Sequence, residues 1–179
     1  MQSRRFLRTL FEYKAWANED LFEVLERLSD PAHAGVKHEA TRILNHVYIV
    51  DRMFASNMQG LQHGYTAVNT PDTPNLGDLR ARVRKMDRFF VEYTDSLTEA
   101  ALAEPIDFTF VDGSPGCMTR EEMLAHVVTH GNYHRGGIGV ILSQGRVPLP
   151  RDTQTDALTV FLHKRRRGQR SRRVTPVYS

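Results

Sequence analysis

Two histidines interrupt an otherwise apolar face of a predicted helix over residues 119–145. Side chains on this face recur every three or four residues, which is the helical period: Met123, Val127, His130, His134, Ile138 and Ile141. At roughly 100° per residue, these side chains fall within a stripe about 80° wide. Because such a stripe is buried against neighbouring helices, both histidines are expected to face the protein interior.

Both ends of this helix are marked in the sequence. Thr119 and Glu122 have the spacing of a capping box, and Gly145 ends the helical pattern. Four glycines inside the helix cost stability relative to alanine: Gly131, Gly136, Gly137 and Gly139. We expect the close approach of another helix, or space beside a bound ligand, to explain them.

The rest of the chain predicts an all-α fold. Apolar periodicity predicts three more long helices and a short one, over residues 4–28, 38–58, 77–97 and 155–163. Before the histidine-bearing helix, Ile106, Phe108 and Phe110 alternate and VDGSPG follows, which predicts a short β-hairpin or an ordered loop. Four long amphipathic helices favour a four-helix bundle, and two long connections argue against a plain up-down-up-down order.

Charge divides the chain into two parts. Seven of the 24 Lys and Arg residues follow His163, and no acidic residue does, so the remainder carries net negative charge. We therefore predict a single helical domain over residues 1–163 and a disordered basic tail over 164–179. Nucleic acid is not an expected partner, apart from a weak contact by this tail.

A single cysteine, Cys117, excludes an intrachain disulfide and a thiolate-rich metal site. Its place before a helix start can lower its pKa, although an inert thiol is the preferred interpretation. The sequence has no run of about 18 apolar residues and no apolar segment typical of a signal peptide. We therefore expect a cytoplasmic protein that does not enter a membrane.

His46 is the candidate third member of a metal site. It interrupts the apolar side of the predicted helix over 38–58, which would place it in the same core as His130 and His134. Three neutral imidazoles leave coordination positions open, as catalytic rather than structural metal sites do. A divalent ion such as zinc or nickel held there can activate water or a thiol at neutral pH.

Alternatives to this ligand set stay open at the level of the residues. Each histidine can instead be a hydrogen-bonded core residue. His126 can replace His134 in an i, i+4 pair, or support a ligand through a hydrogen bond. Arg135 can bind a carboxylate, although a solvated arginine is preferred. Asp51 and Glu122 are predicted on solvent faces, which makes carboxylate ligation a minor possibility.

Three segments together resemble the DinB-like (DinB/YfiT-type) superfamily of four-helix-bundle metalloenzymes. They are YKAWANEDLF at 13–22, ILNHVYIVDRMF at 43–54 and LAHVVTHGNYHRGGIGVIL at 124–142. The resemblance implies an up-down-down-up bundle, a divalent metal, usually zinc or nickel, and a homodimer. Carried onto this chain, it implies the metal ligands His46, His130 and His134.

The resemblance also sets the functional expectation. Some members of that superfamily are transferases or isomerases that use a low-molecular-weight thiol, so we expect a metal-dependent enzyme that activates such a thiol toward a small-molecule substrate. The alternatives are a metal-dependent hydrolase and a non-catalytic, metal-stabilised stress-response or binding module. Neither the thiol nor the electrophile follows from these motifs.

Overall fold

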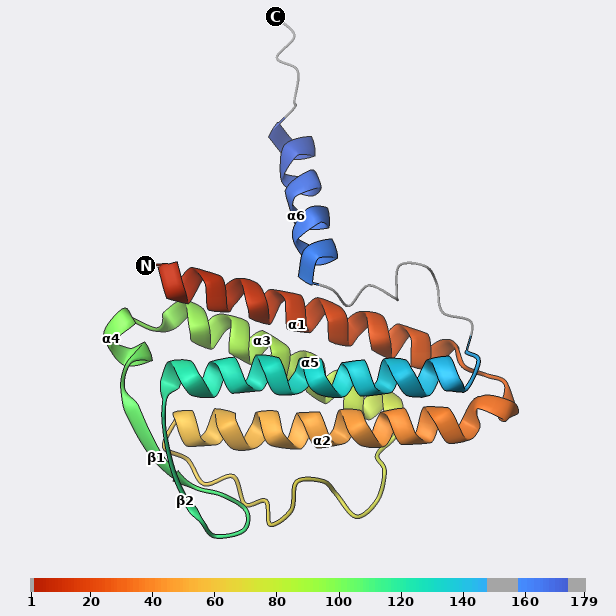
Figure 1. Cartoon of the computed structure of the whole chain (residues 1–179), viewed down its shortest axis with the longest axis horizontal. Helices are drawn as coiled ribbons and strands as arrows, with labels where there is room; N and C mark the ends of the chain where they lie inside the picture. Colours follow the sequence, from red (N-terminus) through yellow and green to blue (C-terminus); the bar gives the residue numbers. More distant parts are fainter. Residues whose placement is uncertain (1, 148–157, 174–179) are drawn as a thin grey trace, which may run out of the picture.

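The structure, a computed structural model of the chain, describes residues 2–147 and 158–173. Most of the described chain is helical, which confirms the all-α class (Figure 1). The four long helices are α1 (Gln2–Arg27), α2 (Ala34–Met58), α3 (Leu76–Ser96) and α5 (Arg120–Gln144). The shorter elements are the 3-10 turn Pro31–His33, α4 (Glu99–Leu102), β1 (Pro105–Thr109), β2 (Pro115–Thr119) and α6 (Leu158–Arg173). The three long helices predicted before residue 105 begin and end within a few residues of their observed bounds.

The long helices pack side by side around one apolar core. Helix α1 contacts α3 and α5, and α2 contacts the same two helices. Phe11 of α1 stacks on Phe90 of α3 with ring centroids 4.9 Å apart, and both rings are buried. Phe6, near the start of α1, is 59% exposed, whereas the next residue, Leu7, is buried. Among the described helices, none is long and apolar enough to cross a membrane.

A β-hairpin precedes α5, as predicted. Strands β1 and β2 pair antiparallel, with Phe108 opposite Gly116. A Cβ added to Gly116 would lie 2.6 Å from the Phe108 ring, so this position has no room for a side chain. The predicted capping box follows directly. Glu122 N–H donates to Thr119 Oγ1 at 3.2 Å, and Thr119 N–H donates to the Glu122 carboxylate at 2.7 Å.

The buried face of α5 is wider than the predicted stripe, because α5 packs against α1 as well as α2. The additional buried residues include Leu124, Val128, Gly131, Arg135 and Leu142. As a result, His130 and His134 lie at one edge of the buried face and are only partly buried. A Cβ on Gly131 would lie 3.2 Å from the Arg135 guanidinium and 3.4 Å from the Lys14 side chain, so the glycine leaves room for these two buried cations. The other three glycines have no such neighbour within 4 Å, so close packing does not explain them.

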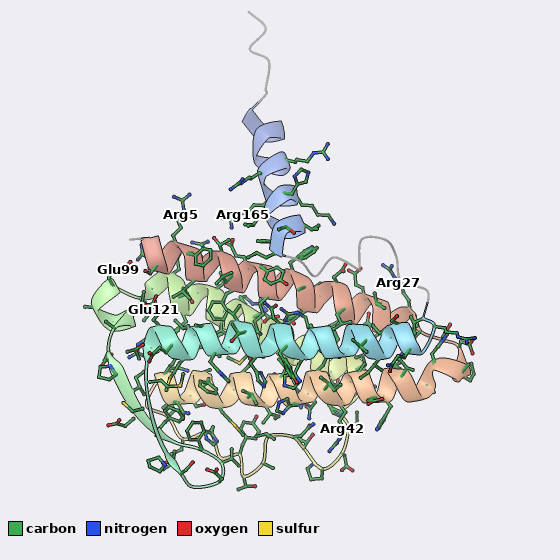
Figure 2. The ribbon with its side chains drawn as sticks, viewed as in Figure 1. Arg5, Arg27, Arg42, Glu99, Glu121 and Arg165 are labelled. Atoms are coloured by element: carbon green, nitrogen blue, oxygen red, sulfur yellow. The ribbon has the colours of Figure 1, made fainter. Side chains whose placement is uncertain are left out.

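Helix α6 differs most from its prediction. It continues to Arg173 rather than ending at His163, so residues 164–173 are helical. Its first turns rest on α1: the Phe161 ring lies 5.8 Å from Trp16, and Arg165 pairs with Glu12 at 2.6 Å (Figure 2). The rest of α6 points away from the four long helices (Figure 1). The predicted start of this helix at residue 155 and the last six residues of the chain lie outside the described residues.

Candidate metal centre

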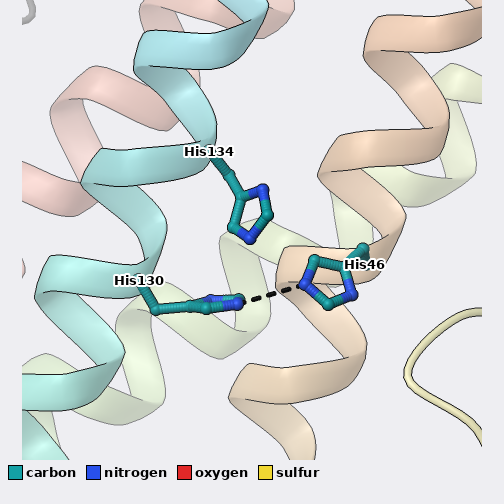
Figure 3. A group of neighbouring side chains, drawn as sticks. All are labelled: His46, His130 and His134. Carbon is teal, nitrogen blue, oxygen red and sulfur yellow. Dashed lines mark hydrogen bonds between the residues drawn. The ribbon is translucent and has the colours of Figure 1, made fainter.

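The structure brings the three predicted histidines together. His46 extends from α2, and His130 and His134 extend from successive turns of α5 toward it (Figure 3). One ring nitrogen from each histidine lies within 4.8 Å of the others, so the group can hold a metal ion. No carboxylate or thiol of the described residues belongs to this group.

The backbone orients His46. Its Nδ1 lies 2.8 Å from the carbonyl oxygen of Val68, in the connection between α2 and α3. Since a carbonyl only accepts, Nδ1 must carry the hydrogen, which puts the lone pair of a neutral ring on Nε2. That Nε2 lies 3.1 Å from Nε2 of His130. Two imidazole nitrogens on one tetrahedral zinc ion stand about 3.3 Å apart, given bonds of about 2.0–2.1 Å, so this spacing fits a shared metal.

Electrostatics keep the α5 histidines neutral. Burial lowers the pKa of His130 to about 3, and the neighbouring His134 and His46 lower it further. Burial also lowers the pKa of His134, and the neighbouring His46 lowers it further. Nδ1 of His130 is buried without a hydrogen-bond partner among the described residues. The hydrogen bond between Nε2 of His130 and Nε2 of His46 stays within the group itself (Figure 3). With their pKa values lowered, the rings of His130 and His134 are neutral at neutral pH, and each neutral ring has one nitrogen with a lone pair.

His126 lies outside the group, one turn before His130. Its ring stacks on Phe54 with centroids 4.5 Å apart, and it lies 5.4 Å from the His130 ring. Burial lowers its pKa. His126 therefore packs beside the site as an aromatic ring and does not replace His134 in the group.

A cavity of about 360 Å³ opens beside the histidines. Its lining comes from α2, α5 and the α2–α3 connection: Glu39, Arg42, Ile43, His46, Asn69 and His134. Two of the three histidines, His46 and His134, thus face a space large enough for a small ligand. Glu122, considered as a carboxylate ligand, is instead occupied by the cap of α5.

A buried polar network beside the site was not predicted. The Lys14 ammonium is fully buried and lies 2.6 Å from the Asp51 carboxylate and 2.8 Å from that of Asp87. Asn18 donates to Asp87 at 2.9 Å, and its amide oxygen accepts from Arg135 at 2.8 Å. Asp51 is 1% exposed and Arg135 is 2% exposed, so the predictions that they face solvent are wrong.

Each of the four long helices contributes to this network. Burial raises the pKa of Asp51 to about 6, although Lys14 acts in the opposite direction. Burial alone would lower the pKa of Lys14, but Asp51 and Asp87 together outweigh it and the pKa is raised. The ammonium therefore stays charged and the carboxylates share it. The positive charges of Lys14 and Arg135 and the negative charges of Asp51 and Asp87 cancel within the network.

The sequence does hold a signal for this network. Among the buried residues of α1 is a series at the heptad spacing of four and three residues: Leu7, Phe11, Lys14, Asn18, Leu21 and Leu25. Lys14 and Asn18 occupy the two central positions. Polar residues at such positions indicate a paired network in the core, and their partners then have to be sought on the facing helices.

Cys117 is not an activated thiol. It is exposed on β2, and Asp107 lies opposite it on β1. A hydrogen bond to Asp107 raises the pKa of the thiol, and burial and the negative charge add to this effect. The alternative of a thiol activated by the start of α5 is therefore wrong, since a raised pKa disfavours the thiolate.

Comparison with known proteins matches most of the chain to one family. The sequence profile of the DinB family matches residues 1–165, which include all four long helices and the three histidines. The chain is 27% identical over 163 residues to Protein DinB of Bacillus subtilis (strain 168), an alignment that covers 82% of this chain and 91% of that protein. No solved structure matches the chain. On the extent of the profile match, the chain belongs to the DinB family.

Proposed function

We propose that this protein binds one divalent ion, zinc or nickel, through His46, His130 and His134, and uses it to activate a low-molecular-weight thiol. The reaction is thiol transfer to an electrophilic small molecule, or a thiol-dependent isomerisation. One observation carries the proposal: three imidazole nitrogens from two helices converge within 4.8 Å, beside a cavity.

A bound divalent cation would lower the pKa of a coordinated thiol, so that the thiolate is available near neutral pH. The residues of the chain do the rest. His130 and His134 stay neutral and offer lone pairs, and the Val68 carbonyl fixes the tautomer of His46. Arg42 and Glu39 place one positive and one negative charge on the wall of the adjacent cavity, which suits a small thiol that carries both kinds of charged group.

The proposal includes the up-down-down-up bundle and the homodimer that the family resemblance implies. The contacts of α1 and α2 with both α3 and α5 support the bundle. The substrate is a small molecule, because the cavity of about 360 Å³ has the size of small-ligand pockets.

Metal content tests the site. Elemental mass spectrometry on protein purified without an affinity tag is expected to find about one zinc or nickel per chain. The variant His130→Ala/His134→Ala should lose it, whereas the control His33→Ala/His38→Ala, which removes two histidines away from the group, should keep it. Stoichiometric metal in the first variant, or no metal in the wild type even after reconstitution, would overturn the ligand assignment.

Turnover tests the chemistry. Metal-loaded protein is incubated with a panel of low-molecular-weight thiols and an aromatic electrophile, and the loss of the electrophile and of free thiol are both followed. Consumption that requires both metal and thiol supports the proposal. Consumption of the electrophile without a thiol would assign hydrolysis instead, with water in place of the thiol. No turnover under either condition would leave a non-catalytic, metal-stabilised protein.

A further inference from the structure

A second and larger cavity lies on the other side of α2. It measures about 640 Å³, is partly open to solvent, and is lined by α2, α3 and the connection between them. Its lining residues on α2 include Tyr48 and Arg52, which follow the helical period, and none of the three histidines lines it. Since His46 lies on the side of α2 that faces α5, this cavity is separate from the candidate metal centre. Its volume falls within the range of small-molecule sites.

Positive charge gathers around this cavity without neutralisation. Arg52, Arg82 and Lys85 line it, and no carboxylate does. Within the part of the chain that the structure describes, none of these three side chains forms an ion pair or a hydrogen bond. By contrast, Arg80 and Arg84 of the same helix both pair with Glu19 of α1. Two cations of helix α3, Arg80 and Arg84, are thus paired on the α1 side, whereas Arg82 and Lys85 at the cavity are not, and concave walls strengthen the field of such charges.

The rest of the lining is aromatic and apolar. Tyr48 is buried, and Tyr65 and Phe89 are partly buried, so their rings present flat apolar surfaces to the cavity. Met86 adds a flexible apolar side chain. Rings of this kind contact an aromatic or apolar body, while the cations bind an anionic group at its end. The lining therefore selects for both properties in one molecule.

We propose that this cavity binds a small organic anion that carries a carboxylate or phosphate on an aromatic or apolar body. Binding there does not require a metal at the histidine group. This proposal goes beyond the proposed function and stands on separate residues.

The fluorescent probe 8-anilinonaphthalene-1-sulfonate, an aromatic anion, tests it. The full-length wild type is compared with Arg82→Gln/Lys85→Gln. The matched control Arg5→Gln/Arg88→Gln removes the same charge from exposed residues that do not line the cavity. The probe Kd should rise about fivefold or more in the cavity variant and stay within about twofold in the control. Equal Kd values in all three proteins, or equal losses in both variants, would overturn the proposal.

Two further measurements complete the test. The neutral probe N-phenyl-1-naphthylamine should bind more weakly than the sulfonate, and its Kd should be the same in both variants. Tighter binding of the neutral probe would contradict an anion site.

In a competition assay, 2-naphthoate and 2-naphthyl phosphate are tested for displacement of the sulfonate. The compound that displaces it at the lower concentration identifies the preferred anionic group, and displacement by neither refutes the proposal. The metal-site variant His130→Ala/His134→Ala should bind the probe as the wild type does, so the two proposals can fail separately.

Discussion

The carbonyl oxygen of Val68 lies 2.8 Å from Nδ1 of His46, which ties one member of the histidine group to the backbone of the α2–α3 connection. The next residue secures this segment. Asn69 donates to the backbone carbonyl of Arg42 at 3.1 Å and accepts from Asn45 at 2.6 Å. The orientation of His46 therefore depends on a loop that α2 itself holds in place.

Replacing Asn69 by alanine should weaken metal binding about tenfold, because the carbonyl that orients His46 loses its anchor while every ligand remains. Competition with a zinc-binding dye measures the affinity. Gln62→Ala, in the same connection at an exposed residue without a described hydrogen bond, is the control and should bind metal as the wild type does. An unchanged affinity in Asn69→Ala would show that the carbonyl is held by other means.

Replacing Lys14 by methionine should lower the free energy of unfolding by about 3 kcal/mol, because two buried carboxylates lose the ammonium that they share. Urea unfolding measures the effect. The exposed pair of Arg27 and Glu23 provides the comparison: Arg27→Met should change stability by less than about 0.5 kcal/mol. In the double variant Lys14→Met/Asp51→Asn, the loss should be smaller than the sum of the two single losses, since one uncompensated charge is removed. Additive losses would contradict a shared charge balance.

Acidification should destabilise the metal-free protein through His130. In the unfolded chain this histidine takes up a proton as the pH falls below 6.5, whereas in the folded protein its pKa is about 3. Between these values, protonation favours the unfolded state, so the contribution of His130 to stability is lost as the pH falls.

Asp51 acts in the opposite sense, because its pKa of about 6 in the folded protein lies above its ordinary 3.8. The effect of His130 is therefore isolated by comparing the wild type with His130→Gln. Between pH 7 and pH 5 in the presence of a chelator, the wild type should lose about 1 kcal/mol more in urea unfolding, allowing for partial solvent exposure. Equal losses would mean that the ring binds its proton as readily in the folded protein as in the unfolded chain.

Removing the cap of α5 should also be measurable. Thr119→Ala should lower stability by about 1 kcal/mol, since the Thr119 hydroxyl accepts from the Glu122 N–H at the helix start. Thr129→Ala is the matched control within the same helix: this hydroxyl only bonds back to helical carbonyls, so its loss should cost nothing or stabilise slightly. A larger loss in Thr129→Ala than in Thr119→Ala would contradict the role of the cap.

The helices, the hairpin and the histidine group could be predicted because each rests on a local signal. The capping box fixes where α5 begins, and the i, i+4 spacing places His130 and His134 on one side whatever packs against them. His46 was predicted because it is a polar residue on an otherwise apolar helix face, and the family resemblance supported the same residue.

The buried network could not be predicted in the same way. A helical wheel gives relative directions around one helix, and Arg135 and Asp51 look solvent-facing only if each helix has one packed neighbour. Both α2 and α5 have two, so the second buried face was missed. Nor does any local pattern in the sequence place Val68 beside His46, because that contact depends on the course of an irregular connection. The length of α6 was underestimated because its later residues carry charge rather than an apolar period.

The network of Lys14, Asp51, Asp87 and Arg135 has a consequence for how such a chain can diverge. Its charges cancel only as a set, and each comes from a different long helix. A relative that has lost the lysine is therefore expected to have lost a carboxylate as well, on a helix distant in the sequence. Residues at these four positions should therefore co-vary in an alignment of the family, and their co-variation would indicate which helices pack against one another.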